Sequence, residues 1–274
     1  MKRLSPTATP NLGILPGSIQ DSVLLITGED PETVEELLKQ LKVSIGQPVR
    51  HREFSTAPCS IAGASFTCSL TGLGSASVEV ALNELFFGGA RTFIHTGTAA
   101  TLNSGKLPVG RPVIVRYAWR DDGASLHYVA GTHRRVSGHP ELLERLRIAA
   151  EQLGIDVEYA VGVSTDAFYA GSAQARGGRL ECPTLLPLRD GLVPVDFQEW
   201  MLPLLREDER YCLDMEVSTF YTLADLIEAS AGVRWASVKG ISNEIPFQPG
   251  QQTEHTERAL KAALRVAIAA MTIG

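Results

Sequence analysis

Short apolar runs alternate with longer amphipathic segments along this chain, a pattern that predicts β-strands each followed by an α-helix. The first run, 22–27, is almost continuously apolar, as expected for a strand that is buried on both faces. After it, Val34, Leu37 and Leu38 recur at the spacing of one helix face, and Asp30 is a residue type that caps helix N-termini. We therefore expect a strand, a short turn and then a helix that begins directly after Asp30.

The pattern continues over the rest of the chain, behind an N-terminal segment of about 20 residues that we expect to be irregular. The expected elements are paired strands within 52–70, a helix at 77–87, strands at 92–94, 112–116 and 157–164, helices at 141–153 and 214–230, a strand at 235–241 and a helix at 256–271. Apolar strands that alternate with helices imply an α/β fold with a mostly parallel sheet covered on both faces.

Three of the predicted strands end in small residues. The exits are at Gly28, at 71–77 and at 96–100, and each lets a ligand approach the backbone at the carboxyl end of a strand. Gly28 precedes a helix N-terminus, where unpaired N–H groups favour an anion, but Glu29 and Asp30 oppose one. For 96–100, a tight turn packed under a helix is an equally good interpretation. The long irregular stretch 172–196 is expected to cover a site as a lid or specificity loop.

Composition narrows the class of protein. The 274 residues are 44% hydrophobic and 20% charged, without a linker-like stretch, so we expect one domain spanning 1–274. The net charge of −6, with scattered lysine and arginine, argues against nucleic-acid binding. Because no stretch of about 18 apolar residues and no signal-like segment occurs, we expect a cytoplasmic protein that does not bind a membrane.

Cysteine and histidine spacing favours no metal site. Cys59, Cys68, Cys182 and Cys212 form no CxxC pair, so reduced and packed thiols are expected. The six histidines lack an HxxxH or HExxH spacing, and we predict no catalytic metal.

Several separated blocks resemble, in order, the uridine phosphorylase branch of the nucleoside phosphorylase family. The blocks are HREFST at 51–56, TGLGSASVEVALNEL at 71–85, GARTFIHTGTAATLNSGKLPVGRPVIV at 89–115, DDGASLH at 121–127, STDAFYAGSAQAR at 164–176, DMEVSTFYTLA at 214–224 and KGISNEIP at 239–246. The resemblance implies a single α/β domain with a mixed, mostly parallel, barrel-like central sheet flanked by helices. It also implies a homodimer as the minimum unit, with a hexamer of three dimers as an alternative, and no cofactor besides the co-substrate phosphate.

The implied reaction is cleavage of a nucleoside by phosphate to a free base and ribose 1-phosphate. Met215 and Glu216 match the family's ribose-binding pair: the carboxylate accepts hydrogen bonds from two hydroxyls while Met215 packs on the sugar. Asp214 stands where uridine phosphorylases also carry an acid, and is a secondary candidate. An exposed acid on an amphipathic helix is the alternative interpretation of Glu216.

Four residues match positions that contact the base. Phe168 follows the pattern of an aromatic that stacks on the heterocycle. Gln174 and Arg176 keep the QxR spacing that suits the carbonyl and N–H edge of uracil, after an apparent two-residue insertion. Asn243 stands where purine-specific relatives have an aspartic acid, and it can donate only a neutral hydrogen bond to the leaving base. Together these residues favour a pyrimidine.

The phosphate positions depart from the family pattern. Two of three expected arginines are replaced, by Thr33 and His95, and the third is Arg52, which the family supplies across the dimer interface. Thr98 can still donate a hydrogen bond, and His95 could add charge if protonated. The resemblance implies that Gly97, Thr98 and Ala99 form the floor that sugar and anion share, and Gly28 is a further candidate for substrate binding.

The missing arginines leave three functions open: phosphorolysis of a uridine-like nucleoside, hydrolysis that needs no phosphate, and nucleoside binding without catalysis. A monovalent cation held at the dimer interface by Glu53 and Ser77 is a further expectation from the resemblance.

Overall fold

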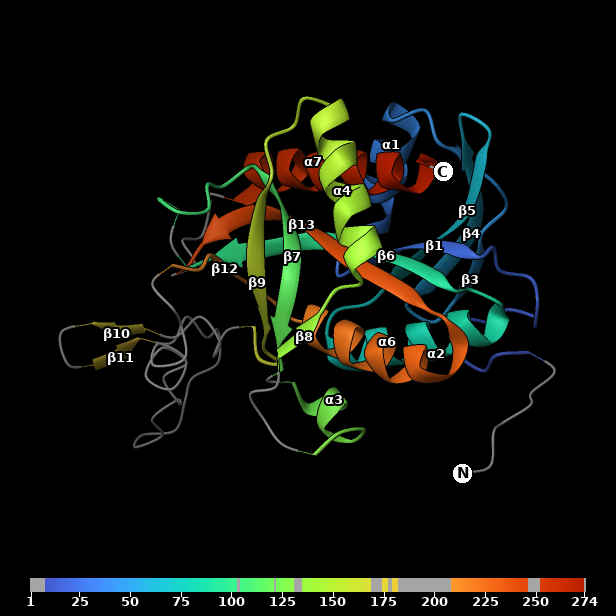
Figure 1. Cartoon of the computed structure of the whole chain (residues 1–274), viewed down its shortest axis with the longest axis horizontal. Helices are drawn as coiled ribbons and strands as arrows, with labels where there is room; N and C mark the ends of the chain where they lie inside the picture. Colours follow the sequence, from blue (N-terminus) through green and yellow to red (C-terminus); the bar gives the residue numbers. More distant parts are fainter. Residues whose placement is uncertain are drawn as a thin grey trace.

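The predicted strands come together in one large mixed sheet, and part of it closes into a barrel (Figure 1). This computed structural model describes residues 8–102, 104–120, 122–130, 135–168, 174–176, 179–181, 208–245 and 252–273. The barrel closes because β12 pairs with β9 on one side and with β6 on the other. Its strands, in spatial order, are β12 (Tyr211–Asp214), β9 (Glu158–Ser164), β7 (Pro112–Trp119), β13 (Arg234–Glu244) and β6 (Thr92–Thr101).

From β6 the sheet continues outward through β1 (Ser22–Thr27), β5 (Ala64–Thr71), β4 (Phe54–Ile61) and β2 (Ser44–Ile45). Two short strands pair off this path: β3 (Val49–His51) with β4 and β8 (Arg135–Ser137) with β7. A separate two-stranded sheet is formed by β10 (Gln174–Arg176) and β11 (Arg179–Glu181). Antiparallel pairs include β13–β7 and the closure β12–β6, so the sheet is more evenly mixed than we expected.

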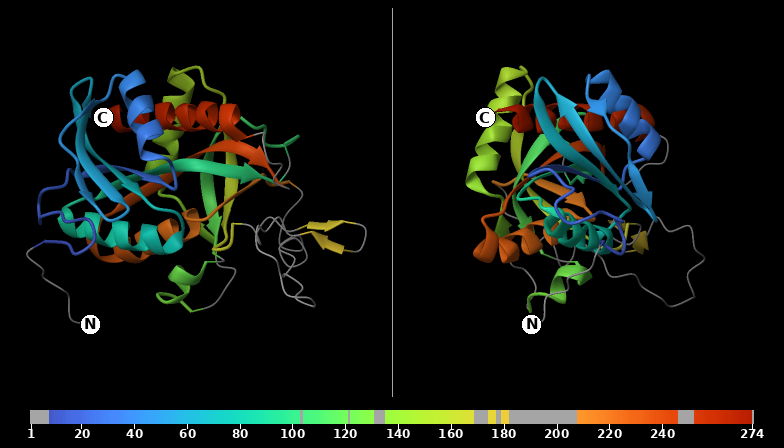
Figure 2. Two further views of the ribbon diagram at one scale, coloured as in Figure 1. Left: turned by 180° about the vertical axis from the view of Figure 1, so that it is seen from behind. Right: turned by 90° about the vertical axis from the view of Figure 1, so that its right-hand side faces the viewer.

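Helices cover both faces of this sheet. On one face lie α2 (Ser75–Gly88) and α6 (Val217–Ala231), and on the other α1 (Pro31–Gln40), α4 (Pro140–Gln152) and α7 (Gln252–Thr272), with the short α3 (Gly123–Leu126) beyond α6 (Figure 2). Alternating residues of β1 serve the two sides: Val23 and Leu25 pack under α2, whereas Leu24 and Ile26 pack under α1 and α7.

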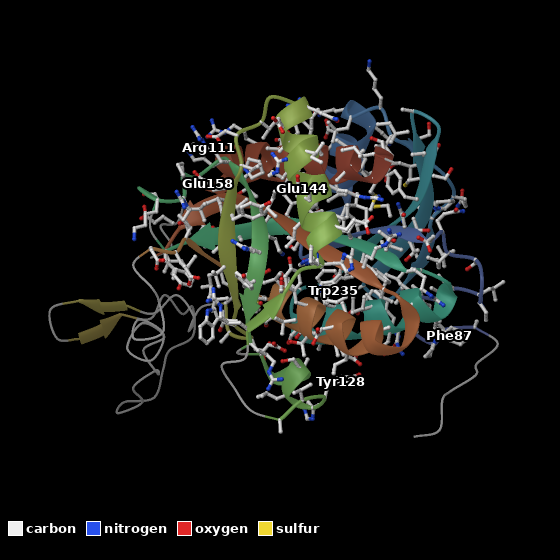
Figure 3. All side chains as sticks on the ribbon, in the orientation of Figure 1. Phe87, Arg111, Tyr128, Glu144, Glu158 and Trp235 are labelled. Atoms are coloured by element: carbon white, nitrogen blue, oxygen red, sulfur yellow. The ribbon has the colours of Figure 1, made fainter. Side chains whose placement is uncertain are left out.

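Individual side chains show the same division. Trp235 of β13 belongs to the core beneath α6, and its indole nitrogen donates to the carbonyl oxygen of Ser137 at 3.1 Å (Figure 3). Continuously apolar strands are thus explained by burial on both faces.

None of the helices in the described ranges is both long and apolar enough to cross a membrane.

The helix expected after Asp30 is confirmed. The Asp30 carboxylate accepts a 2.8 Å hydrogen bond from the backbone N–H of Thr33, and Val34, Leu37 and Leu38 are buried. The segment 8–20 lacks regular structure but is held in place, because Glu84 accepts hydrogen bonds from the backbone N–H groups of Asn11 and Leu12.

Two predictions about element boundaries were wrong. The strand expected at 92–94 does not end at 96–100 but runs for ten residues to Thr101, because its second half pairs with β13 and β12. The helix expected from Asp214 begins at Val217, because Tyr211–Asp214 forms the strand that closes the barrel. Both errors arise from long-range pairing that local sequence does not encode.

Gly97 allows β6 to lie close to the end of β1, its parallel neighbour. Its φ of 151° lies outside the range that side chains readily adopt, and a Cβ placed there would lie 2.8 Å from the carbonyl oxygen of Thr27. The glycine therefore marks a close approach of two strands, not a turn. Most of the expected lid, 172–196, lies outside the described residues, as does Cys182, while the other three cysteines are free and buried.

Candidate functional site

A cavity of about 140 Å³ lies at the carboxyl ends of the barrel strands. Its walls include the end of β1, the last residues of β6, the β12–α6 connection and the end of β13. Eight of the twelve predicted site residues line it: Gly28, Thr98, Ala99, Phe168, Asp214, Met215, Glu216 and Asn243. Arg52 and His95 do not line it, and the side chains of Gln174 and Arg176 lie outside what the structure describes.

A larger cavity of about 240 Å³ lies between α1 and the strands β2 and β4. Its charged residues are Glu35, Lys39 and Arg50, and both cations pair with the Glu35 carboxylate. Since its lining contains none of the predicted site residues, the smaller cavity is the better candidate for chemistry.

Glu216 is buried at the cavity, and protein donors use only part of the hydrogen-bonding capacity of its carboxylate. Oε1 accepts a 2.9 Å hydrogen bond from the backbone N–H of Gly74, and Oε2 lies 3.4 Å from that of Met215. Burial raises the pKa of Glu216, which the charge of Lys239 partly offsets. Each oxygen retains acceptor capacity for a ligand hydroxyl. The exposed-acid interpretation of Glu216 is therefore wrong, because the side chain is only 4% exposed.

Asp214 also lines the cavity, but its hydrogen bonds are made to the protein itself. Its Oδ1 accepts hydrogen bonds from the Ser164 hydroxyl at 2.7 Å and from the backbone N–H groups of Glu216 and Val217 at 3.3 and 3.2 Å. These contacts fix the connection between β12 and α6. Asp214 therefore holds Glu216 in position.

Lys239 supplies the positive charge beneath these acids. Its side chain is fully buried in β13, with Nζ 2.9 Å from Asp214 Oδ2 and 3.5 Å from Glu216 Oε2. Burial by itself lowers the pKa of Lys239, but the two carboxylates outweigh that effect and the pKa is raised. Nζ makes no well-aligned hydrogen bond within the described part of the chain, so the contacts are ion pairs.

Glu29 turns into the same cavity from the end of β1. Its Oε1 accepts a 2.5 Å hydrogen bond from the backbone N–H of Thr98. Burial raises the pKa of Glu29, while hydrogen bonding to Thr98 and the charge of Lys239 act in the opposite direction. A protein carboxylate thus accepts a hydrogen bond from Thr98, the residue that we expected to donate one to phosphate.

His95 lies outside the cavity and is fully buried. Its Nε2 is 3.0 Å from the Thr27 hydroxyl and its Nδ1 is 3.1 Å from the Ser237 hydroxyl. Burial, with a smaller contribution from Lys239, lowers the pKa of His95 well below its ordinary value. The expectation that a protonated His95 contributes charge to phosphate is therefore wrong, because a neutral imidazole is the favoured form there.

Arg52 is exposed in the turn between β3 and β4, where its φ is 54°. It does not reach the cavity of its own chain, and its proposed role across a dimer interface stays a prediction. The two residues suggested for a cation do lie together, since the Ser77 hydroxyl donates to Glu53 Oε1 at 2.9 Å. Thr33 donates to Asp30 through its backbone N–H and its hydroxyl and so belongs to the helix cap.

The structure describes the side chains of two of the four candidates for base binding. Phe168 is 47% exposed at the rim of the cavity, and the Asn243 amide oxygen accepts from the Ser242 hydroxyl at 2.8 Å. Gln174 and Arg176 belong to β10, and their side chains lie outside what the structure describes.

Two residues of the site were not predicted, Lys239 and Glu29. Lys239 has a sequence signal: it is a lysine in the middle of the apolar strand WASVKGIS, where a charge must find a buried partner. Glu29 was expected to oppose an anion, and its contact with Thr98 depends on the pairing of β1 with β6, which brings the ends of the two strands together.

Comparison with known proteins agrees with this geometry. Residues 23–273 match the family model of the phosphorylase superfamily. The chain is 30% identical over 255 residues to the uridine phosphorylase of Thermococcus kodakarensis, covering 93% of this chain and 84% of that protein. It is 29% identical over 147 residues to the purine nucleoside phosphorylase of Plasmodium falciparum, covering 54% and 59%.

Among solved structures, uridine phosphorylase from Vibrio fischeri superposes with a TM-score of 0.71 at 20% identity, over 96% of this chain and 95% of that one. The likeness to that structure establishes the fold. Together with a family model that spans nearly the whole sequence, it means that this chain belongs to the phosphorylase superfamily.

Proposed function

We propose that this protein cleaves the N-glycosidic bond of a pyrimidine nucleoside by phosphorolysis. The observation that carries the proposal is the buried Glu216 carboxylate, which lines a cavity at the strand ends and keeps free acceptor capacity. Two adjacent ribose hydroxyls match such a carboxylate, and Met215 beside it offers an apolar contact to the sugar. The superfamily membership of the chain supports the same activity.

In the proposed reaction a phosphate oxygen forms a bond to C1′ of the ribose as the bond from C1′ to the base nitrogen breaks. The bonding electrons pass to the base, which takes up the proton that monohydrogen phosphate loses, and the products are the free base and ribose 1-phosphate. Glu216 holds the ribose in the geometry that this displacement needs. Asn243 donates a neutral hydrogen bond to the departing base, which suits a pyrimidine better than a purine that must be protonated.

Hydrolysis is the second candidate, and a specific observation favours it. Among the described residues that line the cavity there is no arginine, and the Thr98 N–H is bound to Glu29. The Glu29 carboxylate, whose pKa is raised, lies beside the proposed sugar site and is suited to take a proton from an attacking water. In that reaction water replaces phosphate, and the products are the free base and ribose.

The test is a panel of nucleosides incubated with and without phosphate, with the free base measured. Phosphorolysis predicts base release that requires phosphate and is greatest with uridine-like substrates. Glu216→Ala should reduce kcat/KM by about 10²–10⁴-fold, since it removes two hydrogen bonds of about 1.5–3 kcal/mol each. Glu216→Gln keeps the shape of the side chain, so its kcat/KM should fall less. Glu36→Gln removes an exposed carboxylate from α1 and should leave kcat/KM unchanged. No base release from any nucleoside would reject both candidates.

A further inference from the structure

We infer that Glu29 is a built-in competitor for the nucleophile's anion subsite, so that phosphate must displace its carboxylate from Thr98 before it can bind. The inference rests on the proposed function and concerns the same cavity. It assigns to Glu29 the control of phosphate affinity.

The geometry places Glu29 where an oxyanion would bind. Its Oε1 lies 2.5 Å from the Thr98 backbone nitrogen, a short and charge-assisted contact of the kind that phosphate oxygens also make. Both Glu29 and Thr98 line the cavity that holds Glu216. A carboxylate oxygen and a phosphate oxygen cannot accept from one N–H at that distance together, so one of them must leave.

Lys239 explains why an anion is attracted to this point. A Cβ added to Gly97 would lie 3.4 Å from Glu29 Oε1 and 3.4 Å from Lys239 Nζ, so the two groups flank the same backbone position. Lys239 has two carboxylate partners in Asp214 and Glu216, but no N–H of Nζ is well aligned with an acceptor among the described residues. Its charge acts on the Glu29 carboxylate, and it would act in the same way on a phosphate oxygen that took the place of that carboxylate.

Glu29 can leave because its anchor is slight. The side chain is partly exposed, and its carboxylate accepts a hydrogen bond from Thr98 and is attracted by the charge of Lys239, without an ion pair of its own among the described residues. Gly28 precedes it with a φ of 69°, a backbone conformation that glycine adopts without strain. Rotation of the Glu29 side chain out of the cavity would free the N–H without moving β1 or β6.

As a consequence, the protein binds phosphate more weakly than it would if the Glu29 carboxylate did not occupy the Thr98 N–H. When Glu29 is ionised, its negative charge lies within hydrogen-bonding distance of the position that phosphate would take. The two like charges repel each other, and the repulsion is substantial because the site is partly buried. Removal of the Glu29 carboxylate should therefore tighten phosphate binding, the reverse of what loss of a phosphate ligand would do.

The experiment compares Glu29→Ala and Glu29→Gln with the wild-type protein and with Glu32→Gln, which removes an exposed carboxylate three positions along. Two readouts are taken: the KM for inorganic phosphate at saturating nucleoside, and the rise in Tm on addition of phosphate. The second readout needs no turnover. We expect the phosphate KM to fall about tenfold or more in Glu29→Ala, to fall less in Glu29→Gln, and to change less than about twofold in Glu32→Gln.

The phosphate-induced rise in Tm should follow the same order, because at a given concentration a ligand that binds more tightly stabilises the folded state more. An unchanged or weaker phosphate response in both Glu29 variants would overturn the inference while leaving phosphorolysis intact. Phosphate-independent base release that is lost in Glu29→Ala would also overturn it and would favour hydrolysis. If no variant turns over any nucleoside, the proposed function fails, and the Tm response alone still decides whether Glu29 competes with phosphate.

Discussion

A lysine that is fully buried needs opposite charge close by, and Lys239 finds it in Asp214 and Glu216. The three side chains come from β13 and from the β12–α6 connection, so the ion pairs also join two strands of the barrel. Glu216 is thereby kept rigid beneath the cavity. At the scale of single residues, the site is a buried charge cluster whose members depend on one another.

Lys239→Met should therefore destabilise the protein by about 3–5 kcal/mol, because two buried carboxylates lose their counter-charge. Urea unfolding at neutral pH measures the difference. The control is Lys39→Met, which removes an exposed lysine paired with Glu35 and should cost less than about 1 kcal/mol. Equal effects of the two substitutions would mean that the buried ion pairs do not stabilise the fold.

His95 gives a prediction about pH. Its folded-state pKa is lowered, so the contribution of the neutral imidazole to stability is complete above the unfolded value of about 6.5 and is lost as the pH falls below it. His95→Gln should flatten the loss of unfolding free energy between about pH 6.5 and pH 5. Denaturant unfolding of both proteins across that range measures it, and parallel curves would contradict the prediction.

Asn243 gives a prediction about specificity. Asn243→Asp introduces a group that can protonate a departing purine, so the ratio of purine to pyrimidine nucleoside cleavage should increase by about tenfold or more. The ratio of kcat/KM for inosine and uridine measures the change. A ratio that stays constant would place the determinant of base choice elsewhere in the site.

At the scale of elements, the site depends on where β6 stops pairing with β1. The first half of β6 pairs with β1 and its end pairs with β12, so the strand changes partners within ten residues. Gly97 lies where that change begins, and Thr98 follows it with its N–H directed toward Glu29. One side of the cavity is thus formed by the part of β6 that has left β1.

Gly97→Ala should destabilise the protein by about 3 kcal/mol or more, because a backbone conformation reserved for glycine is combined with a 2.8 Å approach to the Thr27 carbonyl oxygen. The Tm and the KM for phosphate should both change. Gly63→Ala is the control: φ there is 86°, and no atom lies within 4 Å of the added Cβ, so it carries the backbone strain without the contact. A Gly97 variant no less stable than the Gly63 variant would show that the contact is unimportant.

At the scale of the whole molecule, the barrel gathers the cavity lining from segments that are far apart in sequence, while Arg52 remains exposed outside it. We expect Arg52 to serve the site of a neighbouring subunit, as the resemblance to uridine phosphorylases implies. A dimer would then contain two sites, each built from both chains.

Mixing of two inactive variants tests this arrangement. Arg52→Ala and Glu216→Ala should each be inactive alone, whereas co-refolded or co-expressed chains should form mixed dimers with one intact site. Random pairing would restore about a quarter of the wild-type activity. If the mixture stays inactive although mixed dimers are present, Arg52 does not act across an interface.

Local sequence patterns determined much of this protein. The apolar runs predicted most strands and helices, and Asp30 was correctly predicted to cap α1, because periodicity and capping depend on neighbours within a few residues. The motif resemblance led to the superfamily and the barrel, and eight of the twelve predicted site residues line one cavity. Each of these features is carried by short segments.

Tertiary structure decided the rest. Whether 96–100 was a turn or a strand depended on pairing with β13 and β12, and whether His95 carried charge depended on how completely it is buried. The contact of Glu29 with Thr98 joins residues 69 positions apart, and that of Lys239 with Asp214 depends on closure of the barrel. Sequence determined which groups are available, whereas burial and long-range pairing decided their charge and their partners, because both are properties of the assembled fold.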